Sequence, residues 1–171
     1  MKIAEEIMKL MEEIKYGWVD KNGNPHTKLE NMIEMYMLQT PEEAMKSKVG
    51  VCWDQVELER HYFNEKGINT KSYFIVYNDG KKFPCHTTIA FEDNGKFYWF
   101  EHAWDVYKGI KEFDNENDLL EEVKKCFISL ELKDGYDNNQ IFIYNYSKPE
   151  KKLNTLEFYG HCQNGTIVKR G

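Results

Sequence analysis

The sequence lacks the features that would tie it to a membrane or to a nucleic acid. No window approaches the roughly 18 consecutive apolar residues that a membrane-spanning helix needs. The formal net charge is -6, so there is no basic excess to bind a nucleic-acid backbone or an anionic lipid surface. Residues 1–6 already carry acidic charge and do not resemble a secretory signal. We therefore expect a cytoplasmic protein with neither nucleic acid nor membrane as a partner.

Cysteine is scarce and scattered. The four cysteines are Cys52, Cys85, Cys126 and Cys162, with no CxxC pair and no cysteine closely spaced with a histidine. This pattern does not favour a zinc site. A chain of 171 residues with 41% hydrophobic residues can build its own core without disulfides. We expect free thiols, no metal, and one domain over residues 1–171.

Helical periodicity recurs along the chain. Apolar residues at helical spacing predict amphipathic helices over residues 1–15 and 117–131. Thr40-Pro41-Glu42-Glu43 has the residues of a capping box and predicts a helix that runs to about Ser47. Further helices are expected over residues 29–37 and 52–65.

Strand patterns fill most of the second half of the chain. Aromatic and β-branched residues predict strands over residues 72–77, 86–91, 96–101 and 140–146. The dipeptide Asn94-Gly95 is a strong signal for a tight hairpin between two of them. The tail from Lys148 is polar, with one aromatic cluster at Phe158-Tyr159.

Cys52 stands where a thiol can act as a nucleophile. It follows the turn Val49-Gly50-Val51 and begins the helix expected over residues 52–65. The dipole and free N–H groups of a helix N-terminus favour a thiolate, and the backbone N–H of Cys52 would form half of an oxyanion hole. A lone cysteine is more often a small buried apolar residue, so its position alone does not settle its role.

His86 supplies the base that such a thiol needs. If Asn94-Gly95 forms a two-residue turn, strand alternation places Glu101 and Asp105 on the same face as His86. Either carboxylate is then a diagonal neighbour that could orient the imidazole, whereas His102 points to the opposite face. A bulge of one residue would exchange the two faces.

The chain resembles the transglutaminase-like superfamily in three stretches. They are Gly50-Val51-Cys52-Trp53-Asp54-Gln55, His86-Thr87-Thr88-Ile89-Ala90-Phe91 and Gly95-Lys96-Phe97-Tyr98-Trp99-Phe100-Glu101. In that family the nucleophile lies in a G-x-C motif, the base begins a strand, and an acid on the next strand completes the triad. The resemblance covers roughly residues 45–110.

This resemblance implies an α+β fold with a papain/transglutaminase-like core, in which the nucleophile-bearing helix packs on an antiparallel β-sheet. The implied catalytic core spans about residues 45–146. Carried over by position, the triad is Cys52, His86 and Glu101. The family usually has aspartate as the third member, so Asp105 stays open as a substitute.

The second oxyanion donor has no clear candidate in the sequence. Papain-type enzymes carry a glutamine six residues before the nucleophile, where this chain has Lys46. Gln39 and Trp18 are weak alternatives from the preceding segment.

The expected chemistry is acyl transfer at an amide or peptide bond through an acyl-thioester on Cys52. Hydrolysis is favoured over transamidation because the chain has no calcium loop of the D-x-D-x-D-G type. The substrate is a peptide, a protein or a small amide, and no cofactor is implied. Residues 50–64 also resemble arylamine N-acetyltransferases, although the chain is short for that family's third domain. A catalytically inactive module that binds a peptide or protein on the same core is the other alternative.

Several other polar and aromatic residues have ordinary structural interpretations. Asp54, Gln55 and the charged residues of the segment 57–60 are expected on the surface of the helix in local pairs, and some of them could line the substrate cleft. Trp104 is expected in the core or as a wall of the substrate cleft. Cys85 should point away from His86, since adjacent strand residues face opposite sides.

Overall fold

A six-stranded antiparallel sheet forms the centre of the protein. The computed structural model describes all residues from Met1 to Gly171, and neighbouring strands in the sheet are antiparallel throughout. The strand order is β6 (Gly109–Phe113), β5 (Lys96–Glu101), β4 (Cys85–Asp93), β3 (Thr70–Tyr77), β7 (Ile141–Tyr146) and β8 (Thr166–Arg170). A separate two-stranded sheet pairs β1 (Trp18–Val19) with β2 (Pro25–His26).

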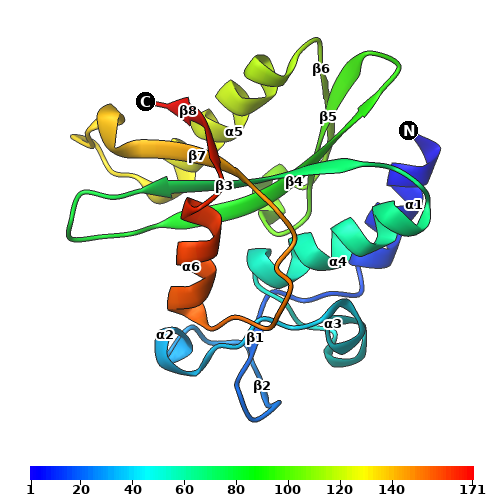
Figure 1. The fold of residues 1–171 in the computed structure, drawn as a ribbon, viewed down its shortest axis with the longest axis vertical. Helices are drawn as coiled ribbons and strands as arrows, with labels where there is room; N and C mark the ends of the chain where they lie inside the picture. The colour runs from blue at the N-terminus through cyan, green and yellow to red at the C-terminus, as the bar shows by residue number, and fades with distance from the viewer.

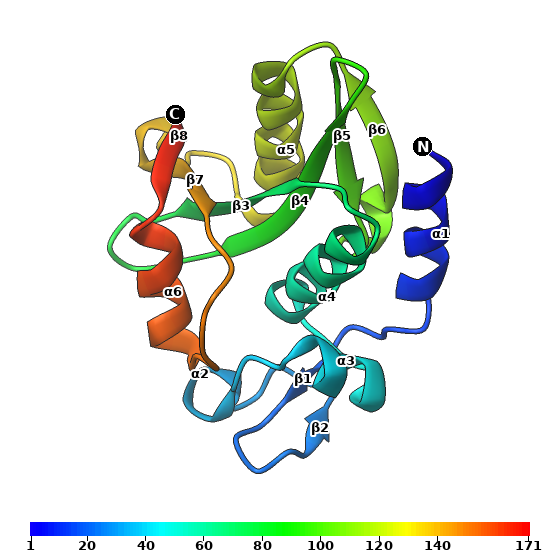
Figure 2. The same ribbon diagram turned by 45° about the vertical axis from the view of Figure 1, so that its right-hand side comes forward.

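Helices cover both faces of the large sheet (Figure 1, Figure 2). The six helices are α1 (Lys2–Met11), α2 (Met32–Met35), α3 (Pro41–Ser47), α4 (Cys52–Glu65), α5 (Glu116–Glu131) and α6 (Thr155–Gln163). One core cluster joins α1, α4 and α6 to one face of the sheet, and a second joins α5 to the other face. The fold is α+β, with the helix that begins at Cys52 packed on an antiparallel sheet, as the sequence predicts. No helix has the length and apolar composition needed to cross a bilayer.

The hairpin between β4 and β5 forms at Asn94-Gly95. Both residues have positive φ, 52° and 74°, as a two-residue turn of the mirror-image type requires. Asp93 pairs with Lys96, so the register predicted from the sequence is confirmed. This register determines which side chains of β4 and β5 share a face, and hence which carboxylate can reach His86.

One sequence-based expectation about elements is wrong, and one region has elements that were not predicted. The helix expected over residues 29–37 is reduced to the single turn α2, because Asn31 adopts a left-handed conformation and Leu29 and Ile33 are 61% and 70% exposed. These apolar side chains have no surface to pack on, so a longer amphipathic helix gains nothing there. The polar tail, for which the sequence analysis predicts no particular element, forms α6 and the edge strand β8.

Phe63 joins α4 to the sheet. Its side chain is fully buried, and its ring centroid lies 5.1 Å from that of Phe91 and 5.3 Å from that of Phe100. We expect Phe63→Ala to lower the free energy of unfolding by about 3–5 kcal/mol, because the cavity adds to the lost apolar burial. Urea titration measures this change. Leu156→Ala, at a position 77% exposed, is the control, and an equal loss there would contradict the assignment.

Candidate active site

Cys52 is the first residue of α4 and is 6% exposed. The first N–H groups of a helix have no acceptor within the helix, and no backbone acceptor outside α4 takes the Cys52 N–H. Gly50 allows the tight approach before the helix, since a Cβ at this position would lie 3.0 Å from the Asp54 Cβ. The thiol and a free N–H are thus presented together at the helix start.

Asp54 fixes this turn from within the protein. Its carboxylate accepts hydrogen bonds from the Tyr36 hydroxyl (2.9 Å), the Gln39 backbone N–H (2.9 Å) and the Val51 backbone N–H (3.1 Å). Burial raises the pKa of Asp54 to about 7, although these hydrogen bonds oppose the rise. The expectation that Asp54 lies on the surface is wrong, because the side chain closes the turn rather than facing solvent.

Gln55 and His102 form a second tether to the same turn. The Gln55 side-chain amide donates to the Gly50 carbonyl at 2.8 Å, and its oxygen lies 2.6 Å from His102 Nδ1. Because that oxygen can only accept, Nδ1 of His102 carries the proton. His102 therefore faces α4, on the side of β5 opposite Glu101. Gln55, Glu57, Glu59 and Arg60 are all buried, so the surface expectation is wrong for them as well.

His86 and Glu101 form a buried pair. Nε2 of His86 lies 2.8 Å from Oε2 of Glu101, and each side chain is no more than 3% exposed. The carboxylate also accepts from the Thr88 hydroxyl (3.0 Å) and from the Trp104 backbone N–H (2.8 Å). Because Nε2 of His86 is bound to Glu101 and both oxygens of Glu101 are held by hydrogen bonds, Nδ1 is the nitrogen of His86 that is left to exchange a proton.

Trp104 stacks on the imidazole. The ring centroids of His86 and Trp104 are 3.5 Å apart, with an angle of 8° between the planes. The indole is 9% exposed, so it limits both the rotation of the base and its access to water. This gives Trp104 a positioning contact that the sequence alone did not reveal.

The Cys52 thiol interacts with His86. Burial alone lowers the pKa of His86, but the charge of Glu101 and the hydrogen bond and charge of Cys52 outweigh it and raise the pKa to about 9. The imidazole is therefore held mainly in its protonated form at neutral pH. A thiol, an imidazole and a carboxylate in this order form the relay that thiol acyl-transfer enzymes use.

This raised pKa links stability to pH. A group whose pKa rises on folding stabilises the protein fully below its unfolded value of 6.5, and this stabilisation is lost as the pH rises through about 9. We expect His86 to contribute a decrease on the order of 3 kcal/mol in the free energy of unfolding between these pH values. Urea titrations from pH 5 to 10 measure it. In Glu101→Gln the slope should be much smaller, and an unchanged slope would contradict the pairing.

The sequence left two carboxylates as candidate partners of His86, and the structure shows which of them contacts it. Glu101 contacts His86, whereas the Asp105 side chain is 94% exposed and pairs with Lys108 at 3.2 Å.

The two weak candidates for the second oxyanion donor are both engaged elsewhere. The Gln39 amide donates to the Val49 carbonyl at 2.8 Å, and the Trp18 indole donates to the Lys28 carbonyl at 2.7 Å.

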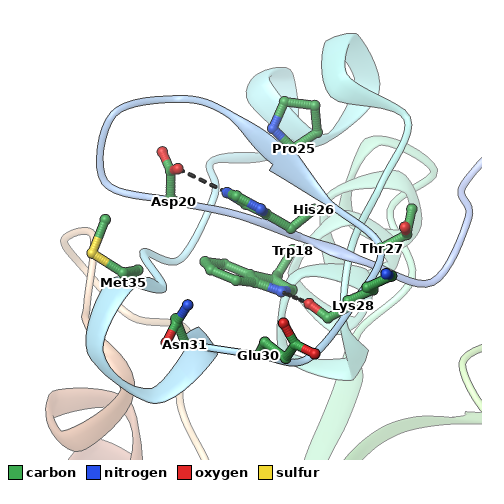
Figure 3. A pocket seen from close by; sticks show the side chains of 9 residues that line it. All are labelled: Trp18, Asp20, Pro25, His26, Thr27, Lys28, Glu30, Asn31 and Met35. Carbon is green, nitrogen blue, oxygen red and sulfur yellow. Dashed lines mark hydrogen bonds and ion pairs between the residues drawn. The ribbon is translucent and has the colours of Figure 1, made fainter.

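A separate pocket of about 440 Å³ lies beside β1 and β2 (Figure 3). There His26 stacks on Trp18, with ring centroids 4.2 Å apart, and its Nε2 lies 2.8 Å from Asp20 Oδ2. None of Cys52, His86 and Glu101 lines this pocket. It holds a histidine–carboxylate pair but no cysteine, so it is not the thiol site. No group of three or more His, Cys, Asp or Glu side chains is placed to hold a metal ion.

Sequence reasoning missed the roles of Asp54, Gln55 and His102 in the site, and it placed Trp104 in the core or the cleft wall without its contact with His86. Asp54 had one available signal, since an acidic residue at the third position of a helix commonly reaches back to the N-cap backbone. The other three depend on contacts between distant segments and have no local signature.

Comparison with known proteins gives a family match. A family model described as a transglutaminase-like domain matches residues 1–125 of the chain, and this stretch includes Cys52, His86 and Glu101. No curated protein matches the sequence.

Proposed function

This chain belongs to the transglutaminase-like domain family, and on that premise we propose that it is a cysteine enzyme that cleaves amide or peptide bonds through an acyl-thioester on Cys52. The observation that carries the proposal is the relay at the start of α4. A thiol beside a helix N-terminus interacts with an imidazole, and a buried carboxylate holds that imidazole at 2.8 Å. Family membership supports a cysteine enzyme; the reaction and the roles of the residues are our proposal.

In the first half-reaction the Cys52 thiolate attacks the carbonyl carbon of the substrate. A carbon–sulfur bond forms, and the carbonyl π electrons move to oxygen, where the Cys52 N–H stabilises the negative charge. As the tetrahedral intermediate collapses, the carbon–nitrogen bond breaks and protonated His86 gives its proton to the leaving amine. The products are a free amine and an acyl-thioester.

In the second half-reaction water attacks the thioester. His86, now neutral, takes a proton from the water, a carbon–oxygen bond forms, and the carbon–sulfur bond breaks to return the thiolate. An amine in place of water would give transamidation. Glu101 acts by keeping Nε2 engaged, so that Nδ1 faces the sulfur and the imidazolium is stabilised.

Trapping of the acyl-enzyme tests this proposal. The protein is mixed with p-nitrophenyl acetate or with a short peptide amide, and intact and peptide mass spectra are recorded during turnover, with and without a primary amine. We expect an acyl group on Cys52 that decays in water to the free acid. A faster decay with formation of the amide would favour transamidation, and acylation by acetyl-CoA alone would favour acetyl transfer. A chain that forms no adduct on Cys52 would refute the proposal.

A further inference from the structure

The backbone just before Cys52 is held by side chains at both ends of one peptide group. The Gly50 carbonyl accepts a hydrogen bond from the Gln55 side-chain amide at 2.8 Å, and the Val51 N–H of the same peptide group donates to Asp54 Oδ2 at 3.1 Å. The Val51 carbonyl, which shares the next peptide group with the Cys52 N–H, accepts from the Gln55 backbone N–H at 2.9 Å. The direction of the Cys52 N–H is therefore set by Gln55 and Asp54.

The orientation of the Gln55 side chain depends in turn on His102. A glutamine amide has an oxygen on one side and an NH2 group on the other, and rotation about its last single bond exchanges the two. Turned over, Gln55 would bring its oxygen against the Gly50 carbonyl, so that two acceptors would meet. His102 Nδ1 lies 2.6 Å from Gln55 Oε1 and holds the amide the other way by donating to that oxygen. Burial lowers the pKa of His102, so the ring is neutral at neutral pH and its single N–H is on Nδ1.

The bond to Gln55 is the one hydrogen bond that the His102 ring makes. Nε2 of His102 is buried and has no hydrogen-bond partner, and the residue is 6% exposed. A buried polar atom without a partner is unfavourable, and an apolar side chain of similar size would fill the same space without leaving one. Packing alone therefore does not account for a histidine at this position, whereas the bond from Nδ1 does.

We propose that His102 is a positioning residue, which acts through Gln55 to aim the Cys52 N–H at the oxyanion. This inference rests on the proposed function, because the oxygen that this N–H would bind becomes negative only when the thiolate attacks a carbonyl. His102 is not itself a donor to the oxyanion. Loss of a whole oxyanion donor slows a reaction by about 100- to 1,000-fold, so a misdirected donor is expected to slow it by about 10- to 100-fold.

Two substitutions of His102 separate this role from a structural one. His102→Leu removes the donor, whereas His102→Asn returns an amide N–H to the place of Nδ1–H. Acylation of Cys52 by p-nitrophenyl acetate passes through an oxyanion, but alkylation by iodoacetamide is a displacement at carbon and forms none. We expect acylation to slow by about 10- to 100-fold in His102→Leu, with the alkylation rate unchanged, and to recover in His102→Asn.

Gln55→Met tests the same chain of bonds from its other end. The side chain keeps its length but can neither accept from His102 nor donate to the Gly50 carbonyl, so we expect the same loss of acylation. The double variant with His102→Leu should lose no more than Gln55→Met alone, because both residues act in one chain. His61→Leu is the control, since it makes the same change at a histidine of α4 that is 29% exposed and pairs with Glu65 at 3.4 Å.

The other outcomes overturn the assignment in distinguishable ways. If His102→Leu is acylated at the rate of wild type, His102 does not position the donor and the proposed function stands. If acylation and alkylation slow together, or if His102→Asn restores nothing, His102 supports the packing of the site rather than the direction of the N–H. Should His102→Leu not fold, acylation of Gln55→Met at the wild-type rate overturns the proposal by itself. If wild-type Cys52 is not acylated at all, the proposed function fails and this inference fails with it.

Discussion

Replacing Cys52 with alanine is expected to reduce acyl transfer by at least about 1,000-fold, since a triad without its nucleophile keeps only background catalysis. The other three cysteines offer no substitute. Burial raises the pKa of the Cys85 thiol to about 12 and raises those of Cys126 and Cys162 as well, so these thiols are poor nucleophiles at neutral pH. Release of p-nitrophenol under saturating ester, measured with Cys52→Ala and wild type, gives the ratio.

Cys85→Ala is the matched control for this experiment. Cys85 precedes the base in β4, but its side chain lies on the opposite face and is near Trp53 and Tyr159. We expect this variant to keep the activity of wild type. If Cys85→Ala loses activity and Cys52→Ala keeps it, the nucleophile has been assigned to the wrong cysteine.

Glu101→Gln is expected to lower kcat by about 100- to 10,000-fold, because an amide can hold the imidazole in the wrong tautomer and cannot stabilise its charge. The charge of Glu101 is the main cause that keeps the pKa of His86 near 9 against burial, which lowers it. Without this charge the pKa of His86 falls. The alkaline limb of kcat/KM, which requires protonated His86, should therefore move to lower pH.

Asp105→Asn makes the same chemical change at an exposed carboxylate. Its pH profile and kcat should match those of wild type, since Asp105 pairs with Lys108 at the surface and does not contact His86. A shifted profile in Asp105→Asn with an unchanged one in Glu101→Gln would reverse the assignment that the geometry favours.

The parts of the fold that follow local rules were predictable. The capping box at Thr40 forms, with the Thr40 hydroxyl accepting from the Glu43 N–H at 3.2 Å, and the Asn94-Gly95 turn sets the hairpin register. The tail also carries a local signal, because Asn154 and Glu157 form a capping box at the start of α6, but its hydrophobic pattern is weak. In α6 few side chains are buried, among them Phe158 and Cys162, while Leu156 faces solvent, so the hydrophobic pattern is too narrow to signal a helix.

In the candidate site, too, some placements were predictable from the sequence and others were not. The register of one hairpin was enough to bring Glu101 to the face of His86, and the G-x-C turn was enough to place Cys52 at a helix start. The catalytic roles of these three residues stay a prediction. The sequence did not predict the supporting contacts. Asp54 accepts a hydrogen bond from Tyr36 and Gln55 is hydrogen-bonded to His102, and both partners are distant in the sequence. Polar residues on a helix normally face water, and these distant partners, together with the bonds to Val51 and Gly50, make their burial favourable.

The most direct test of the central claim is the rate at which iodoacetamide labels each thiol at pH 6, mapped by mass spectrometry in wild type and in His86→Ala. If Cys52 and His86 form a thiolate–imidazolium pair, Cys52 reacts far faster than Cys85, Cys126 and Cys162, and His86→Ala removes that advantage. If Cys52 reacts no faster than the other three thiols and the substitution changes nothing, the pair does not exist. The same core would then be a binding module rather than an enzyme.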